Sequence, residues 1–229
     1  VLNLLPVQLD DKSVRRVSLG SLRRWHEADI VAGDQVAISL AGQGIPRFEG
    51  VVWRVQQREK AIAPDPQDHH SLSCLHNTPA CREQFLARLS WLSQRSVLDM
   101  PGIQRHSWQR LMQMDSFSHL FSWLTVSVGQ LHDLPGISEA RAQHLWHSFQ
   151  LSRQQPIKRW VKALGVPIPE AALKAMQDNS WQQLLARDQQ SWQTLPGVGE
   201  NLAKRITDFL ADESVRSLIV FLQQELEMD

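Results

Sequence analysis

Two glycine-containing turns in the second half of the chain could bind an anion through their backbone N–H groups. The segment LPGVGENLAKRI, residues 195–206, places Gly197 and Gly199 directly before a run of apolar residues with helical spacing. Glycine tolerates backbone angles that a side chain forbids, so we expect both glycines to permit a sharp turn. A turn that leads into a helix leaves several N–H groups without partners, and such groups bind phosphate oxygens.

The same pattern recurs along the chain. The segment LPGISEARAQHL, residues 134–145, repeats it at an offset of 61 residues, and MPGIQRHSWQRL, residues 100–111, keeps the Pro-Gly-Ile core but has Trp108 in place of the small alanine. A more divergent copy is LGVPIPEAALKAM, residues 164–176. The positions equivalent to Glu200 are 105, 139, 170 and 200, with spacings of 34, 31 and 30 residues. Such a period predicts a stacked array of four helical pairs.

The four copies differ in the donors that they offer. We expect Gly165 to Glu170 to be structural, because Pro169 stands where the second glycine should be and proline has no N–H. Ser138 keeps its N–H and is also a good helix cap. The candidate phosphate-binding residues are Gly102, Gln104, Arg105, Gly136, Ile137, Ser138, Gly197, Val198, Gly199, Lys204 and Arg205. The alternative is that these turns only connect the helices of a bundle.

The elements that carry these turns fall into three expected parts. Residues 1–60 alternate apolar and polar residues in short segments around one short helix near 22–30, which predicts a small β domain. Residues 61–90 contain a proline-rich linker and both cysteines, and residues 91–229 show helical periodicity with short turns. The expected fold class is α+β, with a partial OB-fold β-barrel followed by an all-α domain. We expect five tryptophans on apolar helix faces to be buried, namely Trp123, Trp146, Trp160, Trp181 and Trp192.

Composition limits the class of protein. The chain of 229 residues has a formal net charge of zero and only two cysteines, Cys74 and Cys81, which favours a reducing compartment over a secreted disulfide scaffold. No apolar run approaches the length of a membrane helix, so we expect no membrane partner. The chain begins with Val1, and we expect it to be a segment of a longer protein. Four arginines near the start are candidate DNA-backbone contacts, with an ordinary solvated surface as the alternative: Arg15, Arg16, Arg23 and Arg24.

The repeated turns resemble the helix-hairpin-helix motif, whose backbone N–H groups hold a DNA phosphate without reading bases. In addition, PVQLDDKSVRRVSL and DIVAGDQVAISLAGQGIP resemble the OB-fold stretch of the bacterial NAD-dependent DNA ligases, although Gly20-Ser21 and Gln43-Gly44 depart from its pattern. The segment CLHNTPACREQ resembles the second half of that family's zinc segment, and LSQRSVLDMPGI resembles its entry into the hairpin array. The small number of cysteines and the absence of a BRCT segment after the repeats resemble the shorter B-type enzyme of enteric bacteria.

This resemblance implies the part of a ligase that holds nicked double-stranded DNA in the bacterial cytoplasm, as a monomer, with its OB part against the minor groove and its first OB strand missing. The family's nucleophilic lysine lies in Lys-x-Asp-Gly, and no lysine of this chain is followed by x-Asp-Gly. We therefore expect no catalytic residue here, an inactive segment, and NAD bound elsewhere in the parent enzyme. The resemblance also implies magnesium as a cofactor. The family's zinc site has four cysteines. Here Cys74 and Cys81 would need His69, His70 or His76, so zinc is not expected.

Two other interpretations remain open. The chain could be a non-catalytic helix-hairpin-helix module that binds DNA or a partner in a repair complex. It could also be an unrelated helical bundle, which would show no salt-sensitive DNA affinity. The resemblance of residues 1–60 to the ligase OB-fold stretch favours the ligase over both.

Overall fold

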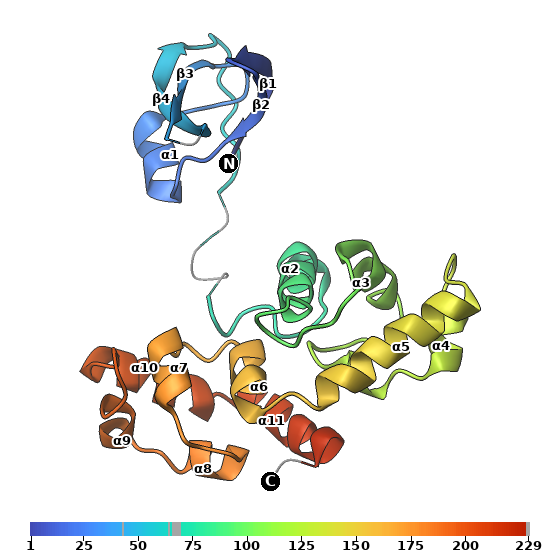
Figure 1. Ribbon diagram of the computed structural model, residues 1–229. Helices are drawn as coiled ribbons and strands as arrows, with labels where there is room; N and C mark the ends of the chain where they lie inside the picture. The colour runs from blue at the N-terminus through green and yellow to red at the C-terminus, as the bar shows by residue number, and fades with distance from the viewer. Residues whose placement is uncertain (43, 64, 66–69, 228–229) are drawn as a thin grey trace. The chain divides into compact units, whose positions relative to one another are not determined.

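The computed structural model describes residues 1–42, 44–63, 65 and 70–227, and it divides the chain into two compact units, residues 1–65 and 66–229 (Figure 1). This division has two parts where the sequence suggested three. Much of the expected middle segment, residues 61–90, belongs to the second unit, because its helix α2 (Arg82–Leu92) buries Phe85, Leu86 and Leu89 in the helical core.

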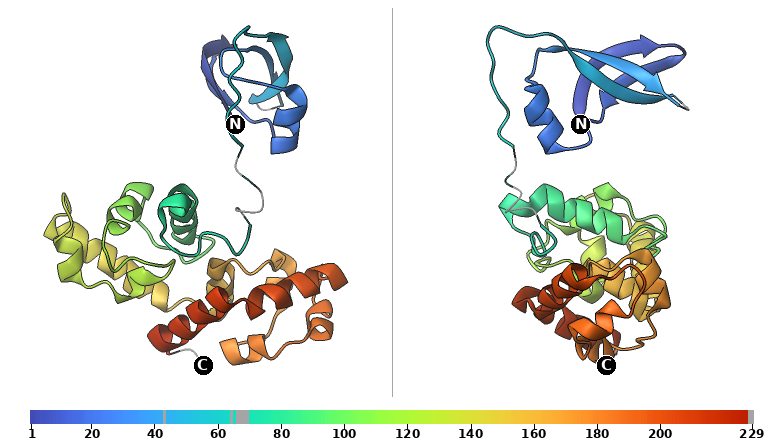
Figure 2. Two further views of the ribbon diagram at one scale, coloured as in Figure 1. Left: turned by 180° about the vertical axis from the view of Figure 1, so that it is seen from behind. Right: turned by 90° about the vertical axis from the view of Figure 1, so that its left-hand side faces the viewer.

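Unit 1 consists of two antiparallel hairpins and one short helix. Strand β1 (Leu2–Leu9) pairs with β2 (Lys12–Val17), and β3 (Gln35–Ala41) pairs with β4 (Ile45–Trp53). Helix α1 (Leu22–Ala28) lies between the hairpins in the sequence, as the residue pattern predicted. Figure 2 shows the hairpins and α1 from two further sides.

The strands of unit 1 do not join into one continuous sheet within the described residues. The hairpins meet where β2 contacts β4, and Ser18 and Arg47 form a single parallel bridge there. Both hairpins also contain register shifts, one between Asn3 and Val7 and two near the start of β3. Bulges of this kind interrupt a hydrogen-bond ladder and bend its strands. The α+β class agrees with the prediction, whereas the partial barrel is present only as two separate two-stranded sheets.

A buried carboxylate ties the end of unit 1 to the loop before β3. The Asp34 side chain is fully enclosed and accepts hydrogen bonds from the N–H groups of Val31, at 3.1 Å, and Val55, at 3.0 Å. Arg58 also donates to Asp34, at 3.0 Å. Burial raises the pKa of Asp34, but these hydrogen bonds and the guanidinium charge outweigh it, so its pKa lies below the ordinary value. Asp34 therefore stays ionised and links three segments of unit 1.

The regular elements of unit 2 are all helices within its described residues, apart from one isolated bridge between His76 and His119. Besides α2 it contains η1 (Pro79–Cys81), α3 (Arg105–Leu111), η2 (Ser122–Thr125), α4 (Val128–His132), α5 (Glu139–Arg153), α6 (Ile157–Leu164), α7 (Glu170–Ala175), α8 (Trp181–Leu185), α9 (Gln189–Gln193), α10 (Glu200–Ala211) and α11 (Glu213–Leu226). None of the helices in the described ranges is long and apolar enough to cross a membrane.

The repeat found in the sequence corresponds to helix starts. Arg105, Glu139, Glu170 and Glu200 are the first residues of α3, α5, α7 and α10. Before each lies a short connection from a preceding helix, and we name these connections hairpin 1 (residues 100–104), hairpin 2 (134–138), hairpin 3 (165–169) and hairpin 4 (195–199). The flanking helices pack on each other in three cases, α2 on α3, α4 on α5 and α9 on α10. Repeats 1 to 4 are the helix pairs around these hairpins.

Equivalent positions of the repeats share one hydrophobic core. Ala142 and Ala203 are fully buried, and so is Trp108, which replaces the alanine in repeat 1. The larger side chain is accommodated because its ring stacks on Phe149, with centroids 5.9 Å apart, and its Nε1–H donates to Ser93 Oγ at 3.3 Å. The same position in the repeat therefore takes either a small or a large residue, depending on its neighbours.

Four of the five tryptophans expected in the core are fully buried, namely Trp123, Trp160, Trp181 and Trp192. The prediction for Trp146 was wrong, because its side chain is 37% exposed. Residues such as Ala142, Leu145 and Phe149 form the buried face of α5, and Trp146 lies at the edge of that face. Helical periodicity identifies an apolar stripe but does not show how far the neighbouring helices cover it.

Cys74 and Cys81 form a disulfide, which the cysteine count did not predict. The bond connects Cys74, which lies in the turn before η1, to Cys81, the last residue of η1, which directly precedes α2. It therefore anchors the start of α2 to the segment that enters unit 2.

Candidate nucleic-acid interface

Hairpins 1, 2 and 4 share one backbone geometry. Their first glycines, Gly102, Gly136 and Gly197, have φ values of +77°, +73° and +77°. In each hairpin the N–H of the fourth residue donates to the C=O of the first residue, at 3.4, 3.1 and 3.2 Å respectively. Proline at the second position and a left-handed glycine at the third are typical of a type II β-turn. These three hairpins are therefore the same structural unit.

The second glycine does not have the role expected from the sequence. Gly199 has a φ of −86°, an extended conformation open to any residue, and no atom lies within 4 Å of a Cβ added there. Ser138 and Gln104, at the same position, have φ values of −75° and −112°. The expectation of a special conformation at Gly199 was therefore wrong, because the turn is made by the first glycine alone.

Unpaired N–H groups gather at these three hairpins. In the described part of the chain, no hydrogen bond is formed by the N–H groups of the third and fifth residues of hairpins 1, 2 and 4. Both residues are exposed in every case. The buried fourth residues, Ile103, Ile137 and Val198, donate inside the turn, so they hold the hairpin in place rather than facing a ligand. Each hairpin thus offers free donors that could bind an anion.

Hairpin 3 offers no such donors. The N–H groups of Gly165, Val166 and Ile168 donate to carbonyls within repeat 3, and Pro167 and Pro169 have none. Its left-handed glycine, with φ of +87°, caps the end of α6 rather than forming the turn before α7. The chain therefore carries one repeat that differs chemically from the other three.

The charged residues expected near hairpins 1 and 4 are exposed. Lys204 and Arg205 lie on the first turns of α10, where Lys204 pairs with Asp208 at 2.6 Å. Arg105 pairs with Glu83 at 2.7 Å, and its side chain is 49% exposed. Exposed pairs of this kind contribute little to stability, so they can exchange their partners for a phosphate at low cost.

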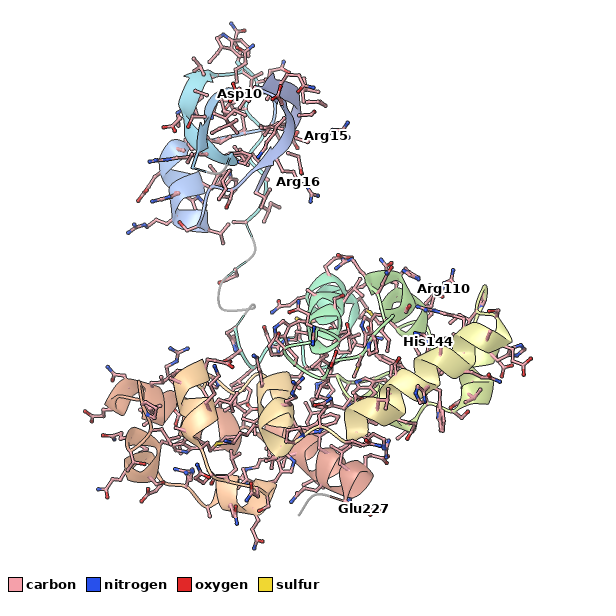
Figure 3. The ribbon with its side chains drawn as sticks, in the orientation of Figure 1. Asp10, Arg15, Arg16, Arg110, His144 and Glu227 are labelled. Atoms are coloured by element: carbon pink, nitrogen blue, oxygen red, sulfur yellow. A yellow bond between two sulfur atoms is a disulfide. The ribbon has the colours of Figure 1, made fainter. Side chains whose placement is uncertain are left out.

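Sequence reasoning missed three basic residues that bring hairpins 1 and 2 together. Arg110 of α3 donates to the C=O of Gly136, and Arg141 of α5 donates to the C=O of Gly102, at 2.7 Å. His144 of α5 lies so close to Gly102 that a Cβ there would overlap its ring. Figure 3 labels Arg110 and His144, which lie between α3 and α5. Alignment of the repeats could have found two of them, because Arg110 and His144 occupy equivalent positions.

The four arginines of unit 1 lie on two elements. Arg15 and Arg16 are exposed on β2, as labelled in Figure 3, and Arg16 donates to Asn3 at 3.3 Å. Because they are consecutive on a strand, their side chains leave it in different directions. Arg23 and Arg24 are exposed on α1. All four side chains are accessible to a ligand, but they belong to two different elements and so do not form a single run along one strand or helix.

No metal site is present among the residues that the structure describes. They contain no group of three or more His, Cys, Asp and Glu side chains that could hold a metal ion. The candidate ligands Cys74 and Cys81 are joined to each other, and His70 accepts a hydrogen bond from the N–H of Leu72 at 3.2 Å. His69 lies outside the described residues.

The first part of the chain is similar to a known protein family. Residues 1–60 match the family model described as the NAD-dependent DNA ligase OB-fold domain. The match ends within unit 1, close to Arg58. The side chain of Arg58 donates a hydrogen bond to Asp34, which lies in the loop before β3. A segment similar to the OB-fold domain of these ligases therefore precedes the helical repeats.

Proposed function

We propose that the chain is the DNA-holding part of an NAD-dependent DNA ligase, an enzyme that joins 5′-phosphate and 3′-hydroxyl ends in nicked double-stranded DNA. The observation that carries this proposal is the match of residues 1–60 to the ligase OB-fold domain. The chain also resembles the shorter B-type enzyme of enteric bacteria. The proposed parent enzyme is therefore bacterial, cytoplasmic and monomeric.

The helical unit supplies a physical means of holding DNA. Hairpins 1, 2 and 4 act as helix-hairpin-helix elements whose free N–H groups bind backbone phosphates. Contacts to phosphate position a protein on the duplex without reading its sequence, as a ligase that seals any nick requires. Hairpin 3 lacks these donors and serves to connect the other repeats.

The chemistry of ligation belongs to another part of the longer enzyme. Residues 1–229 contain no Lys-x-Asp-Gly segment. NAD would therefore bind outside this segment, which by itself transfers no adenylate, and magnesium is the ion that the family implies for the parent enzyme. Zinc has no part in the proposal, since Cys74 and Cys81 form a disulfide.

The test removes the hairpin N–H donors without changing the turn. Ser138→Pro and Gly199→Pro delete one donor each at φ values of −75° and −86°, close to those of proline, and Pro169 already occupies this position in hairpin 3. The matched control is Ser138→Ala with Gly199→Ala, which keeps both N–H groups. Binding of each full chain to nicked and intact duplex DNA is measured over a range of salt concentrations.

We expect the proline pair to bind at least about tenfold more weakly than the alanine pair, because hydrogen bonds to charged groups contribute about 1.5–3 kcal/mol each. Binding should also weaken steeply with salt. Equal affinities for the two pairs, or no binding at low salt, would show that the hairpins only connect helices.

A non-catalytic helix-hairpin-helix module of a repair complex is the second candidate. The free donors of three hairpins favour it as much as they favour the ligase, because they require only a phosphate backbone. The two candidates differ in the coding sequence upstream of Val1. A Lys-x-Asp-Gly segment there supports the ligase, and an open reading frame without one supports the module.

A further inference from the structure

The peptide group between Gly136 and Ile137 in hairpin 2 is held at both ends. Its N–H donates to the C=O of Leu134 at 3.1 Å, inside the turn. Its C=O accepts a hydrogen bond from Arg110, which lies on α3 and so belongs to repeat 1. Because both ends are bonded, this peptide plane cannot rotate without breaking a hydrogen bond. The free N–H of the next residue, Ser138, is thereby aimed in one direction.

Hairpin 1 is held in the same way from the other side. The N–H of Ile103 donates to Met100 at 3.4 Å, and the C=O of Gly102 accepts from Arg141 of α5, in repeat 2. Arg141 also donates to the buried Ser107 Oγ at 3.0 Å, which fixes its guanidinium between the hairpin and α3. Each of the two repeats therefore provides the arginine that fixes the other repeat's hairpin.

Hairpin 4 has no arginine that donates to the carbonyl of its first glycine. Among the described residues no side chain donates to the C=O of Gly197, and the nearest neighbours of this glycine on the Cβ side are carbons of Pro169, 3.9 Å away. The first glycine of hairpin 4 thus faces an apolar proline ring. The hydrogen bonds from an arginine to the glycine carbonyl are therefore particular to hairpins 1 and 2 and are not required for the turn itself.

We infer that Arg110 and Arg141 are positioning residues for phosphate binding, which act through the carbonyls of Gly136 and Gly102. They keep the free N–H groups of hairpins 1 and 2 in fixed directions, so that the two hairpins bind the phosphates of a duplex as one unit. This inference rests on the proposed function, because it assumes that the hairpins bind DNA.

The test is a double-mutant cycle on the full chain with nicked duplex DNA as the probe. The variants are Arg110→Gln, Ser138→Pro and the combination. Arg216→Gln is the control, because Arg216 is exposed on α11 and its side chain forms no hydrogen bond or ion pair among the described residues. A residue that acts only through the hairpin donors has little further effect once a donor is gone. We expect Arg110→Gln to weaken binding about tenfold alone and less than about twofold in the Ser138→Pro background.

Two further measurements separate positioning from charge and from damage to the fold. Arg110→Lys keeps a donor within reach of Gly136 and should recover most of the affinity. In the free protein, the amide of Ile137 should exchange faster in Arg110→Gln while its melting temperature stays near that of Arg216→Gln. Unchanged exchange of this amide would overturn the inference even if the variant binds DNA poorly.

The binding outcomes distinguish the two proposals. Independent, multiplying effects of Arg110→Gln and Ser138→Pro would mean that Arg110 acts as a separate charge, and the inference would be wrong. An Arg110→Gln variant that binds like Arg216→Gln would also overturn it while leaving the proposed function intact. A wild-type chain that binds no DNA would reject the proposed function itself.

Discussion

Arg110 and His144 occupy equivalent positions in repeats 1 and 2, and each lies against the first glycine of the other repeat's hairpin. Arg110 contacts Gly136, and the ring of His144 covers Gly102. In each of the two repeats, the residue at this position therefore contacts the hairpin of the other repeat. Hairpins 1 and 2 form one surface whose parts come from both repeats, so a change in either repeat affects the donors of both.

The two glycine positions of a hairpin should respond differently to alanine. Gly136→Ala forces a side chain into a φ of +73°, and its Cβ would lie 3.2 Å from Arg110 Nη1. We expect a loss of about 1–2 kcal/mol in the free energy of unfolding. Gly199→Ala adds a Cβ in open space at a φ of −86° and should be neutral or stabilising by up to about 1 kcal/mol. Denaturant unfolding of both variants is the measurement, and equal losses would contradict the assignment of the turn to the first glycine.

Trp108 and Trp146 should differ in their contribution to stability. Trp108 is fully buried against Phe149, so Trp108→Ala leaves a cavity, and we expect a loss of about 3–5 kcal/mol in the free energy of unfolding. Trp146 is 37% exposed at the edge of the α5 packing face, so Trp146→Ala should cost less than half of that amount. Thermal and denaturant unfolding measure both, and a comparable loss at the two positions would argue against the packing of α5.

The stability of unit 1 should depend on pH through Asp34. Its folded-state pKa is lowered, since hydrogen bonds from Val55, Val31 and Arg58 outweigh the effect of burial. The stabilisation is complete above the unfolded pKa of about 3.9 and is lost as pH falls through the folded pKa. Asp34→Asn should destabilise unit 1 at neutral pH and flatten this acid dependence. Amide exchange in β3 and β4 follows unit 1 alone, with Asp11→Asn as control, and an unchanged acid profile in Asp34→Asn would count against this role.

Reduction of the disulfide should destabilise unit 2. Opening the short loop between Cys74 and Cys81 increases the entropy of the unfolded chain, and a loop of this size corresponds to about 2–3 kcal/mol. We expect Cys74→Ser with Cys81→Ser to lower the free energy of unfolding by this amount. Reductant should bring the wild type to the same value and leave the serine variant unchanged. A wild type insensitive to reductant would mean that the bond does not stabilise the fold.

Much of the candidate interface could be predicted because it depends on local rules. A Pro-Gly turn and the helix that follows it involve fewer than ten neighbouring residues, so the repeat located the first residue of α3, α5, α7 and α10. The cap at Ser138 follows from its side chain, which accepts from the N–H of Arg141 at 3.3 Å. The match of residues 1–60 agrees with the resemblance found in the local sequence of the same segment.

The sequence by itself determined the positions of the repeats, the α+β class and the lack of N–H donors at the prolines of hairpin 3, because each depends on residue type and spacing. Only the tertiary structure decided that Arg110 and Arg141 each donate a hydrogen bond to the hairpin of the other's repeat. It also decided that Trp146 is partly exposed and that Cys74 pairs with Cys81. The physical reason is that these features depend on which helix faces meet. Periodicity shows that a helix has an apolar face, but the partner of that face is chosen by packing between segments far apart in the chain.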